Sequence, residues 1–252
     1  MKSPTENRLS KIAAVTFGFW IIKVIATTLG EVGGDAVTMS MKLGYLAGSL
    51  IFAAIFILAV SAQISAKKFH PFLFWFVIVA TTTFGTALAD FFDRSLGIGY
   101  VGGSSSLFFL LMATLGIWYW SMGSVSTRSI TSPKAETFYW VTIMFSQTLG
   151  TALGDLLSET TGYAGGFMVF AGGLAVVALL HFFTKMNKVA LFWAAFILTR
   201  PLGATLGDFL DKPVAHGGLD LSRYVASTLL AVAIATLVMV LPQRPERVNV
   251  TI

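Results

Sequence analysis

One spaced pattern occurs four times along the chain and constrains its fold more than any other feature. In each copy a Trp is followed after nine residues by a Gly, and after three further residues by a Gly or Ala with an Asp directly behind it. The copies are Trp20–Gly30–Gly34–Asp35, Trp75–Gly85–Ala89–Asp90, Trp140–Gly150–Gly154–Asp155 and Trp193–Gly203–Gly207–Asp208. Self-similarity at fixed spacing indicates tandem copies of one structural unit. The chain therefore contains four repeats, predicted over residues 12–66, 67–122, 136–184 and 188–241.

Each repeat contains two apolar stretches of about 20 residues, the length of an α-helix that crosses the hydrocarbon core of a membrane. Only 12% of the residues are charged, whereas a soluble domain has roughly 25%. The stretches do not alternate polar and apolar residues as the strands of a membrane barrel do. The predicted spans are 12–34, 44–65, 71–92, 100–121, 137–157, 165–184, 188–210 and 222–241. The sequence predicts one all-α membrane domain over residues 1–252, with eight transmembrane helices in a pseudo-symmetric bundle of four parallel two-helix repeats.

The basic residues gather on one side of this predicted bundle. Eleven of the 17 Lys and Arg residues lie in the amino tail, the even-numbered connections and the carboxyl tail. They are Lys2, Arg8, Lys11, Lys67, Lys68, Arg128, Lys134, Lys185, Lys188, Arg244 and Arg247. The positive-inside rule therefore places both termini in the cytoplasm, as an even helix count requires. Because the charge follows topology, the net charge of +5 does not indicate nucleic-acid binding. The chain has no Cys, so disulfides and thiolate metal sites are excluded.

The four copies resemble a known family of bacterial integral membrane proteins, which are built from four tandem two-helix repeats with a characteristic Trp and are catalogued as a repeat of unknown function. The resemblance rests on the four Trp…Gly…Gly-Asp copies and covers nearly the whole chain. It implies a multi-pass protein in the bilayer of the bacterial inner membrane. It implies no activity and no cofactor, so the function has to be inferred from the residues.

The small residues of the motif predict close contacts between the odd-numbered helices. Helices in lipid are held together by close backbone approach at small residues, because burial of apolar surface gives no advantage there. We expect these four helices to form an inner ring, with the Gly and Ala residues at its contacts and the Trp residues at its inner end. The predicted packing residues are Trp20, Trp75, Trp140, Trp193, Gly30, Gly34, Gly85, Gly150, Gly154, Gly203 and Gly207.

The Asp of each copy is expected near the outer end of its helix, since it follows the Trp by 15 residues, about 22 Å of helix rise. A carboxylate there faces the negative end of the helix dipole and the edge of the hydrocarbon, and both disfavour it. The four residues Asp35, Asp90, Asp155 and Asp208 therefore either face a cation or serve as helix caps and internal ion-pair partners. The sequence leaves both interpretations open.

Polar residues also lie beneath these Asp residues at helical spacing. Among them are Thr28, Thr83 and Thr148, each seven positions before its Asp. A hydroxyl-rich stripe indicates either a path that leads toward the middle of the membrane or hydroxyls that bond their own backbone.

Repeats 1 and 4 carry charged residues that the other repeats lack. Glu31 lies one turn below Asp35, and two carboxylates so close suit a divalent cation or a shared proton. These two residues are the candidate metal ligands. Lys23 and Arg200 lie deeper in helices 1 and 7, where charges face the bundle interior and pair. We expect both to face carboxylates, either as part of a functional site or as salt bridges that fix the packing.

The chain has no phosphate-binding loop, nucleophile elbow or soluble catalytic module, so we expect no enzyme activity. The polar residues converge on the outer half of the bundle axis. They predict a secondary transporter or exporter of a small cation, such as Mn²⁺ or Mg²⁺, coupled to protons, because oxygen ligands suit hard cations. The alternatives are a cation channel with a ring of four Asp, a structural or sensory membrane protein, and an organic-solute carrier. The asymmetry of repeats 1 and 4 favours a carrier, while substrate, direction and homo-oligomer formation stay open.

Overall fold

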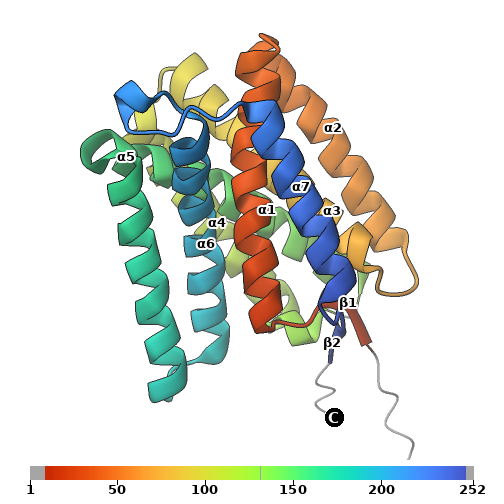
Figure 1. The fold of residues 1–252 in the computed structure, drawn as a ribbon. Helices are drawn as coiled ribbons and strands as arrows, with labels where there is room; N and C mark the ends of the chain where they lie inside the picture. The colour runs from red at the N-terminus through yellow and green to blue at the C-terminus, as the bar shows by residue number, and fades with distance from the viewer. Residues whose placement is uncertain (1–8, 131, 248–252) are drawn as a thin grey trace, which may run out of the picture.

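The computed structural model describes residues 9–130 and 132–247, and long helices make up most of it (Figure 1). In chain order the main elements are β1 (Leu9–Ala13), α1 (Phe17–Asp35), α2 (Gly44–Ser65), α3 (Pro71–Asp90), α4 (Gly99–Met122), α5 (Pro133–Phe183), α6 (Lys188–Asp211), α7 (Arg223–Val240) and β2 (Pro245–Arg247). The short turns are the π-helical η1 (Ala36–Ser40) and η2 (Phe91–Ser95) and the 3₁₀-helical η3 (Thr127–Ser129) and η4 (Val214–His216). The predicted all-α class is confirmed.

Seven of the described helices are long and apolar enough to cross a membrane, one fewer than the sequence predicts. The difference lies in α5, which has 51 residues and includes both apolar stretches of the third repeat. Gly162 interrupts α5 with φ 70° and ψ 169°, a conformation that glycine adopts readily and other residues avoid. α5 therefore consists of two helical segments that meet at a kink. Figure 1 shows the chain turning back there, at the end of the bundle opposite β1 and β2.

The start of α1 also differs from the prediction, which begins the first helix at residue 12 and is wrong for residues 12–16. Residues 9–13 form β1, which pairs antiparallel with β2. The side-chain oxygen of Thr16 accepts a hydrogen bond from the N–H of Phe19, so that α1 begins one residue after Thr16. Because β1 and β2 pair, the described ends of the chain lie at the same end of the bundle (Figure 1).

Four helices, one from each repeat, form a ring at the centre of the molecule. α1 packs against α3 and α6, and α5 packs against the same two helices. More than half of the most apolar stretch is buried in α1, α3 and α6, compared with less than a third in α2, α4 and α7. In α5 the buried residues lie before Gly162, apart from Gly166 and Phe170, so the segment before the kink is the one that belongs to the ring. The buried side chains therefore concentrate on the ring, and the other helices surround it.

The outer helices pack chiefly on the ring helix of the next repeat. α2 packs against α3, α4 packs against α5, and α7 packs against α1. Repeat 4 thereby covers repeat 1, and the arrangement closes on itself. Each repeat depends on a neighbour to cover its ring helix, as in other repeat architectures.

The small residues of the motif lie where the ring helices touch. The first Gly of each copy packs tightly against the residue eight positions before the Asp of the next copy: Gly30 against Thr82, Gly85 against Gln147, Gly150 against Arg200 and Gly203 against Thr27. The second row of contacts joins Gly34 to Thr86, Gly154 to Ala204 and Gly207 to Glu31. The same contact thus recurs around the ring, which gives it pseudo-fourfold symmetry.

Candidate functional site

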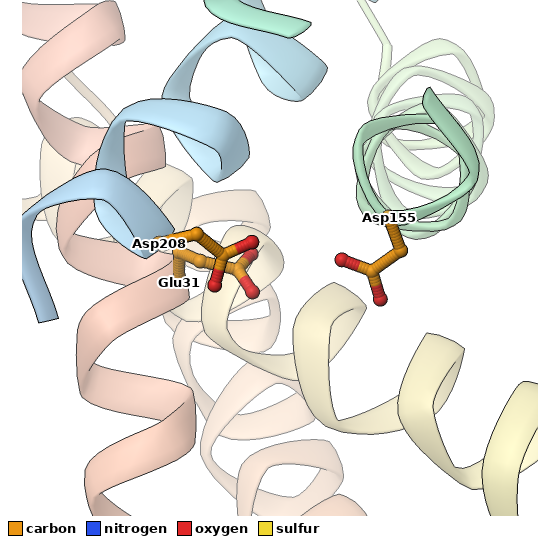
Figure 2. Close-up of side chains that lie close together, drawn as sticks. All are labelled: Glu31, Asp155 and Asp208. Carbon is orange, nitrogen blue, oxygen red and sulfur yellow. The ribbon is translucent and has the colours of Figure 1, made fainter. Parts of the chain in front are cut away.

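Acidic side chains from the ring helices gather at the end of the ring opposite β1 and β2. Glu31, Asp155 and Asp208 are buried, and each offers a carboxylate oxygen within 4.8 Å of those of the other two. Figure 2 shows Glu31 and Asp208 next to each other, with Asp155 directed toward them from α5. Asp35, Asp208 and Asp211 form a second buried group with the same spacing. Asp208 belongs to both groups, so they form one continuous acidic cluster.

The geometry differs from the predicted metal pair of Glu31 and Asp35. These two residues belong to different groups, and each group is completed by carboxylates from other repeats. The ring therefore brings together carboxylates that are distant in sequence. Neither group of three carboxylates could be identified from the one-turn spacing of Glu31 and Asp35 within α1.

Arg94, at the end of η2, connects the cluster across repeats 2 and 3. Its Nε lies 3.0 Å from the Asp90 carboxylate, and its Nη2 lies 3.3 Å from the Asp155 carboxylate. Its Nη1 donates to the hydroxyl of Tyr45 at 3.0 Å. All three guanidinium nitrogens are therefore engaged, and this is how Asp90 joins the cluster.

Lys212 and Arg223 connect the cluster across repeats 4 and 1. Lys212 donates to the carboxylate of Asp35 and lies 3.0 Å from that of Asp208. Arg223 pairs with Asp211 and lies 3.6 Å from Asp35. Lys212 directly follows the end of α6, and Arg223 is the first residue of α7. They bind the first and fourth repeats together at the point where the ring closes.

The surrounding carboxylates keep Lys212 positively charged. Burial alone would lower the pKa of Lys212, but the carboxylates of Asp208 and Asp35 outweigh the burial, so that its pKa is raised above the ordinary value. A lysine whose pKa is raised stays an ammonium throughout the neutral range. The cluster therefore keeps this counter-charge at physiological pH.

The motif Asp residues do not act as helix caps. Asp35 and Asp90 precede the π-helical turns η1 and η2, and neither side chain makes a cap hydrogen bond. Asp155 and Asp208 lie inside α5 and α6. Of the interpretations left open by the sequence, capping fails, internal ion pairing accounts for part of the arrangement, and the cation-facing role stays a prediction.

Arg200 of α6 occupies the axis of the ring directly beneath the cluster. Its Nη2 donates to Glu31 Oε2 at 2.9 Å, to the Thr86 hydroxyl at 2.5 Å and to the Thr151 hydroxyl at 2.6 Å. Its Nη1 donates to the carbonyl of Thr27 at 3.3 Å. Arg200 thus contacts the other three ring helices and faces a carboxylate, as the sequence predicts.

Lys23 differs from its predicted pairing. It is fully buried, and within the described residues its Nζ has no hydrogen-bond partner and no carboxylate within ion-pair distance. The Nζ lies 3.7 Å from the centroid of the Phe196 ring, which is the geometry of a cation–π contact. Lys23 therefore belongs to an apolar layer below Arg200 rather than to the acidic cluster.

The hydroxyl stripe does not line the cluster. The hydroxyls of Thr28, Thr83 and Thr148 each donate to the backbone carbonyl four residues earlier. Lone Thr residues in membrane helices commonly make this bond. The hydroxyls that do reach the axis are those of Thr86 and Thr151, which bind Arg200.

The other end of the ring is closed by aromatic side chains and by the chain ends. Three of the four motif Trp are buried, and Trp20 is half-buried. The indole N–H of Trp75 donates to the side-chain oxygen of Gln243 at 3.1 Å, and that of Trp193 donates to the carbonyl of Val125 at 3.0 Å. Trp75 therefore holds the carboxyl-terminal segment beneath the ring, and Trp193 holds the link between repeats 2 and 3 there.

Four site residues were not predicted: Arg94, Asp211, Lys212 and Arg223. Two of them could have been predicted from the sequence. Arg94 and Lys212 each follow a motif Asp by four residues, a spacing that brings side chains together on a helix. The contribution of Arg223 depends on how α7 packs against α1. No local pattern in the sequence specifies that contact.

The fold and the site together define an all-α, four-repeat protein whose helices are suited to crossing a membrane and whose ring encloses a buried acidic cluster. The family model described as Repeat of Unknown Function (DUF347) matches the chain four times, at residues 18–69, 73–124, 138–187 and 191–242. The chain belongs to this family, as the resemblance in the sequence indicates. Comparison with the curated proteins and with the solved structures found no match.

Proposed function

We propose that this protein is a secondary transporter that moves a small divalent cation, such as Mn²⁺ or Mg²⁺, across the bacterial inner membrane in exchange for protons. The observation that carries the proposal is the position of Asp208, whose carboxylate belongs to two overlapping groups of three buried carboxylates. Groups of carboxylate oxygens at this spacing suit hard divalent cations.

The charges of the site support a cation as the cargo. The six carboxylates of Glu31, Asp35, Asp90, Asp155, Asp208 and Asp211 face the four cationic side chains of Arg94, Arg200, Lys212 and Arg223. The site therefore has an excess of two carboxylates when all groups are charged. Buried charge of one sign is costly in a membrane protein, and a divalent cation or two protons would neutralise it.

The layers below the cluster favour a carrier over a channel. Arg200 fills the axis beneath the carboxylates, and the buried Lys23 and Phe196 lie in the next layer. A cation channel requires a continuous path lined by rings of similar groups. A cationic side chain on the axis opposes that path, whereas a carrier can open one end of the axis at a time.

The proposed topology has eight crossings with both termini in the cytoplasm. The two segments of α5 support it, because a straight helix of 51 residues would be about 76 Å long, far beyond the ~30 Å hydrocarbon core. Two crossings by α5 also agree with the pairing of β1 and β2 at one end of the bundle. The basic residues of that end then place the acidic cluster on the outer side.

A flux screen in proteoliposomes tests the proposal. Purified protein is reconstituted with an interior metal indicator, and Mn²⁺, Mg²⁺, Na⁺ and K⁺ are each offered with and without a pH gradient. The proposal predicts divalent cation flux that a pH gradient drives and that Glu31→Gln with Asp35→Asn removes. Cation flux at channel rates without proton movement would favour the channel, and no flux of any cation would contradict transport.

A further inference from the structure

Asp93, at the rim of the acidic cluster, is a buried acid with no partner. Its side chain is 6% exposed, and neither carboxylate oxygen has a hydrogen-bond partner within the described residues. Its Oδ1 lies against the backbone of Gly103 on α4, so closely that a Cβ at that position would collide with it. The hydroxyl of Ser104, next along α4, is also buried without a partner. An ionised carboxylate is strongly disfavoured in such a place.

Comparison of the internal repeats shows that an unpaired carboxyl at this position is specific to repeat 2 among the described residues. The equivalent position, three residues after the motif Asp, is Thr38 in repeat 1, Ser158 in repeat 3 and Asp211 in repeat 4. Thr38 donates to the carbonyl of Gly34, and Asp211 pairs with Arg223. Asp93 is the carboxyl among the four that has no cation.

The cation nearest to Asp93 is engaged elsewhere. Arg94 is its neighbour in the chain, yet the guanidinium of Arg94 binds Asp90, Asp155 and Tyr45. The elements packed against η2 are α2, α3 and α4, and their titratable groups nearby are Tyr45, Asp90 and Tyr100. All three interact with Arg94, and among the described residues the charged side chain close enough to influence Asp93 is that of Arg94.

We propose that Asp93 carries a proton in this conformation and is the proton-coupling residue of the transporter. When cation enters, the O–H bond of Asp93 breaks and the proton leaves to the water on the outer side. The carboxylate that forms accepts N–H donors from Arg94, which withdraws from Asp90 and Asp155. Those two carboxylates are then free to bind the divalent cation.

This exchange couples the two ions through one mobile guanidinium. Arg94 neutralises either the cluster or Asp93, so a proton on Asp93 and a cation on the cluster oppose each other. The opposition is reciprocal by linkage, because an ion that weakens the binding of a second ion is weakened by it equally. The coupling between proton and cation rests on the proposed transport function. The protonation of Asp93 does not depend on that function.

The first arm of the test measures the protonated carboxyl directly. Infrared spectra of the full-length protein in lipid nanodiscs at neutral pH are compared between wild type, Asp93→Asn and Asp93→Ser, the last being the residue that repeat 3 has at this position. Both variants should lose one carboxylic C=O band, whereas the control Glu159→Gln, at an exposed position, should keep it. Spectra of both Asp93 variants that retain every protonated carboxyl band would overturn the proposal.

The second arm measures coupling with Mn²⁺ alone as the probe. Calorimetry in buffers of different ionisation enthalpy gives the protons released per Mn²⁺ bound, and Asp93→Asn should release about one fewer than wild type and bind Mn²⁺ with a flatter pH profile. Equal proton release in the two proteins would refute the coupling. If no variant and no wild-type protein binds Mn²⁺, the proposed function fails and the coupling with it, while the infrared arm still decides whether Asp93 holds a proton.

Discussion

Arg200 and Glu31 form a fully enclosed ion pair between the fourth and first repeats, with Arg200 Nη2 2.9 Å from Glu31 Oε2 and 0% and 4% of the two side chains exposed. The pair lies on the ring axis beneath the acidic cluster, at the seam where the ring closes. It is supported by Thr86 and Thr151, which bond the same nitrogen. The pair therefore links closure of the ring to the charge of the candidate site.

Breaking this pair on one side should destabilise the protein strongly. Arg200→Met leaves Glu31 buried without its cation, and we expect the free energy of unfolding to fall by about 3–5 kcal/mol. Adding Glu31→Gln should restore part of the loss, because the second change removes the uncompensated charge. The measurement is denaturant unfolding in mild detergent, followed by tryptophan fluorescence.

The matched control is Arg128→Met, which removes a cation whose side chain is 59% exposed and lies 3.3 Å from Glu246. An exposed pair contributes about 0–1 kcal/mol. Equal destabilisation by Arg200→Met and Arg128→Met would show that the axial pair has no special role.

The glycine contacts of the ring predict opposite effects for the same substitution at two sites. A Cβ at Gly85 would lie 2.9 Å from the backbone N of Thr148, so Gly85→Ala should force α3 and α5 apart and cost about 1–3 kcal/mol. Gly116 on α4 has nothing within 4 Å of the same position. There Gly→Ala should stabilise the helix by about 0.5–1 kcal/mol. Thermal unfolding of the two variants decides the matter, and a neutral Gly85→Ala would contradict close packing at this contact.

The raised pKa of Lys212 sets the pH range over which its ion pairs contribute stability. Because the folded-state pKa lies above the unfolded one, the contribution is complete below the unfolded value, roughly 10.4, and is lost only as pH rises through the folded-state value. Lys212→Gln should therefore lower the melting temperature by an amount that stays constant between pH 6 and about 9. An offset that disappears within that range would show that the ammonium is not held by Asp35 and Asp208.

Single-cysteine labelling tests the proposed crossings, and the absence of native Cys makes it direct. If both segments of α5 cross, Lys134→Cys and Lys185→Cys should react from the cytoplasmic side, and Thr160→Cys near the Gly162 kink should react from outside intact cells. His216→Cys in η4 should also react from outside. Labelling of positions 134 and 185 from opposite sides of the membrane would mean that α5 crosses once.

The fold followed from the sequence where the signal was periodic. The four copies of the motif predict the ring helices and their small-residue contacts, because identical spacing produces identical faces. The pairing of β1 with β2 was missed, since it joins segments more than 230 residues apart that show no strand pattern of their own. The count of helices differed at α5, because Gly162 bends the third repeat without separating its two helices by a loop.

The site followed from the sequence only in part. The motif indicates that four Asp residues lie at one end of the ring. The sequence also predicts that Arg200 faces a carboxylate, which the structure shows to be that of Glu31. The cations that neutralise the cluster depend on how chain segments outside the ring fold back over it, as with Arg223 and Asp211. The prediction that Lys23 faces a carboxylate was wrong. Its position on one face of α1 does not reveal that its neighbour on α6 is the Phe196 ring.

The most direct test of the central claim is Mn²⁺ flux in proteoliposomes containing Asp208→Asn, with Asp220→Asn at an exposed loop position as the control. Asp208 belongs to both carboxylate groups, so replacing its charge should lower pH-driven flux by more than about tenfold, the factor that 1.4 kcal/mol of lost binding produces. The variant should keep a wild-type elution profile, and Asp220→Asn should keep wild-type flux. Full flux by a correctly folded Asp208→Asn protein would contradict a transport role for the acidic cluster.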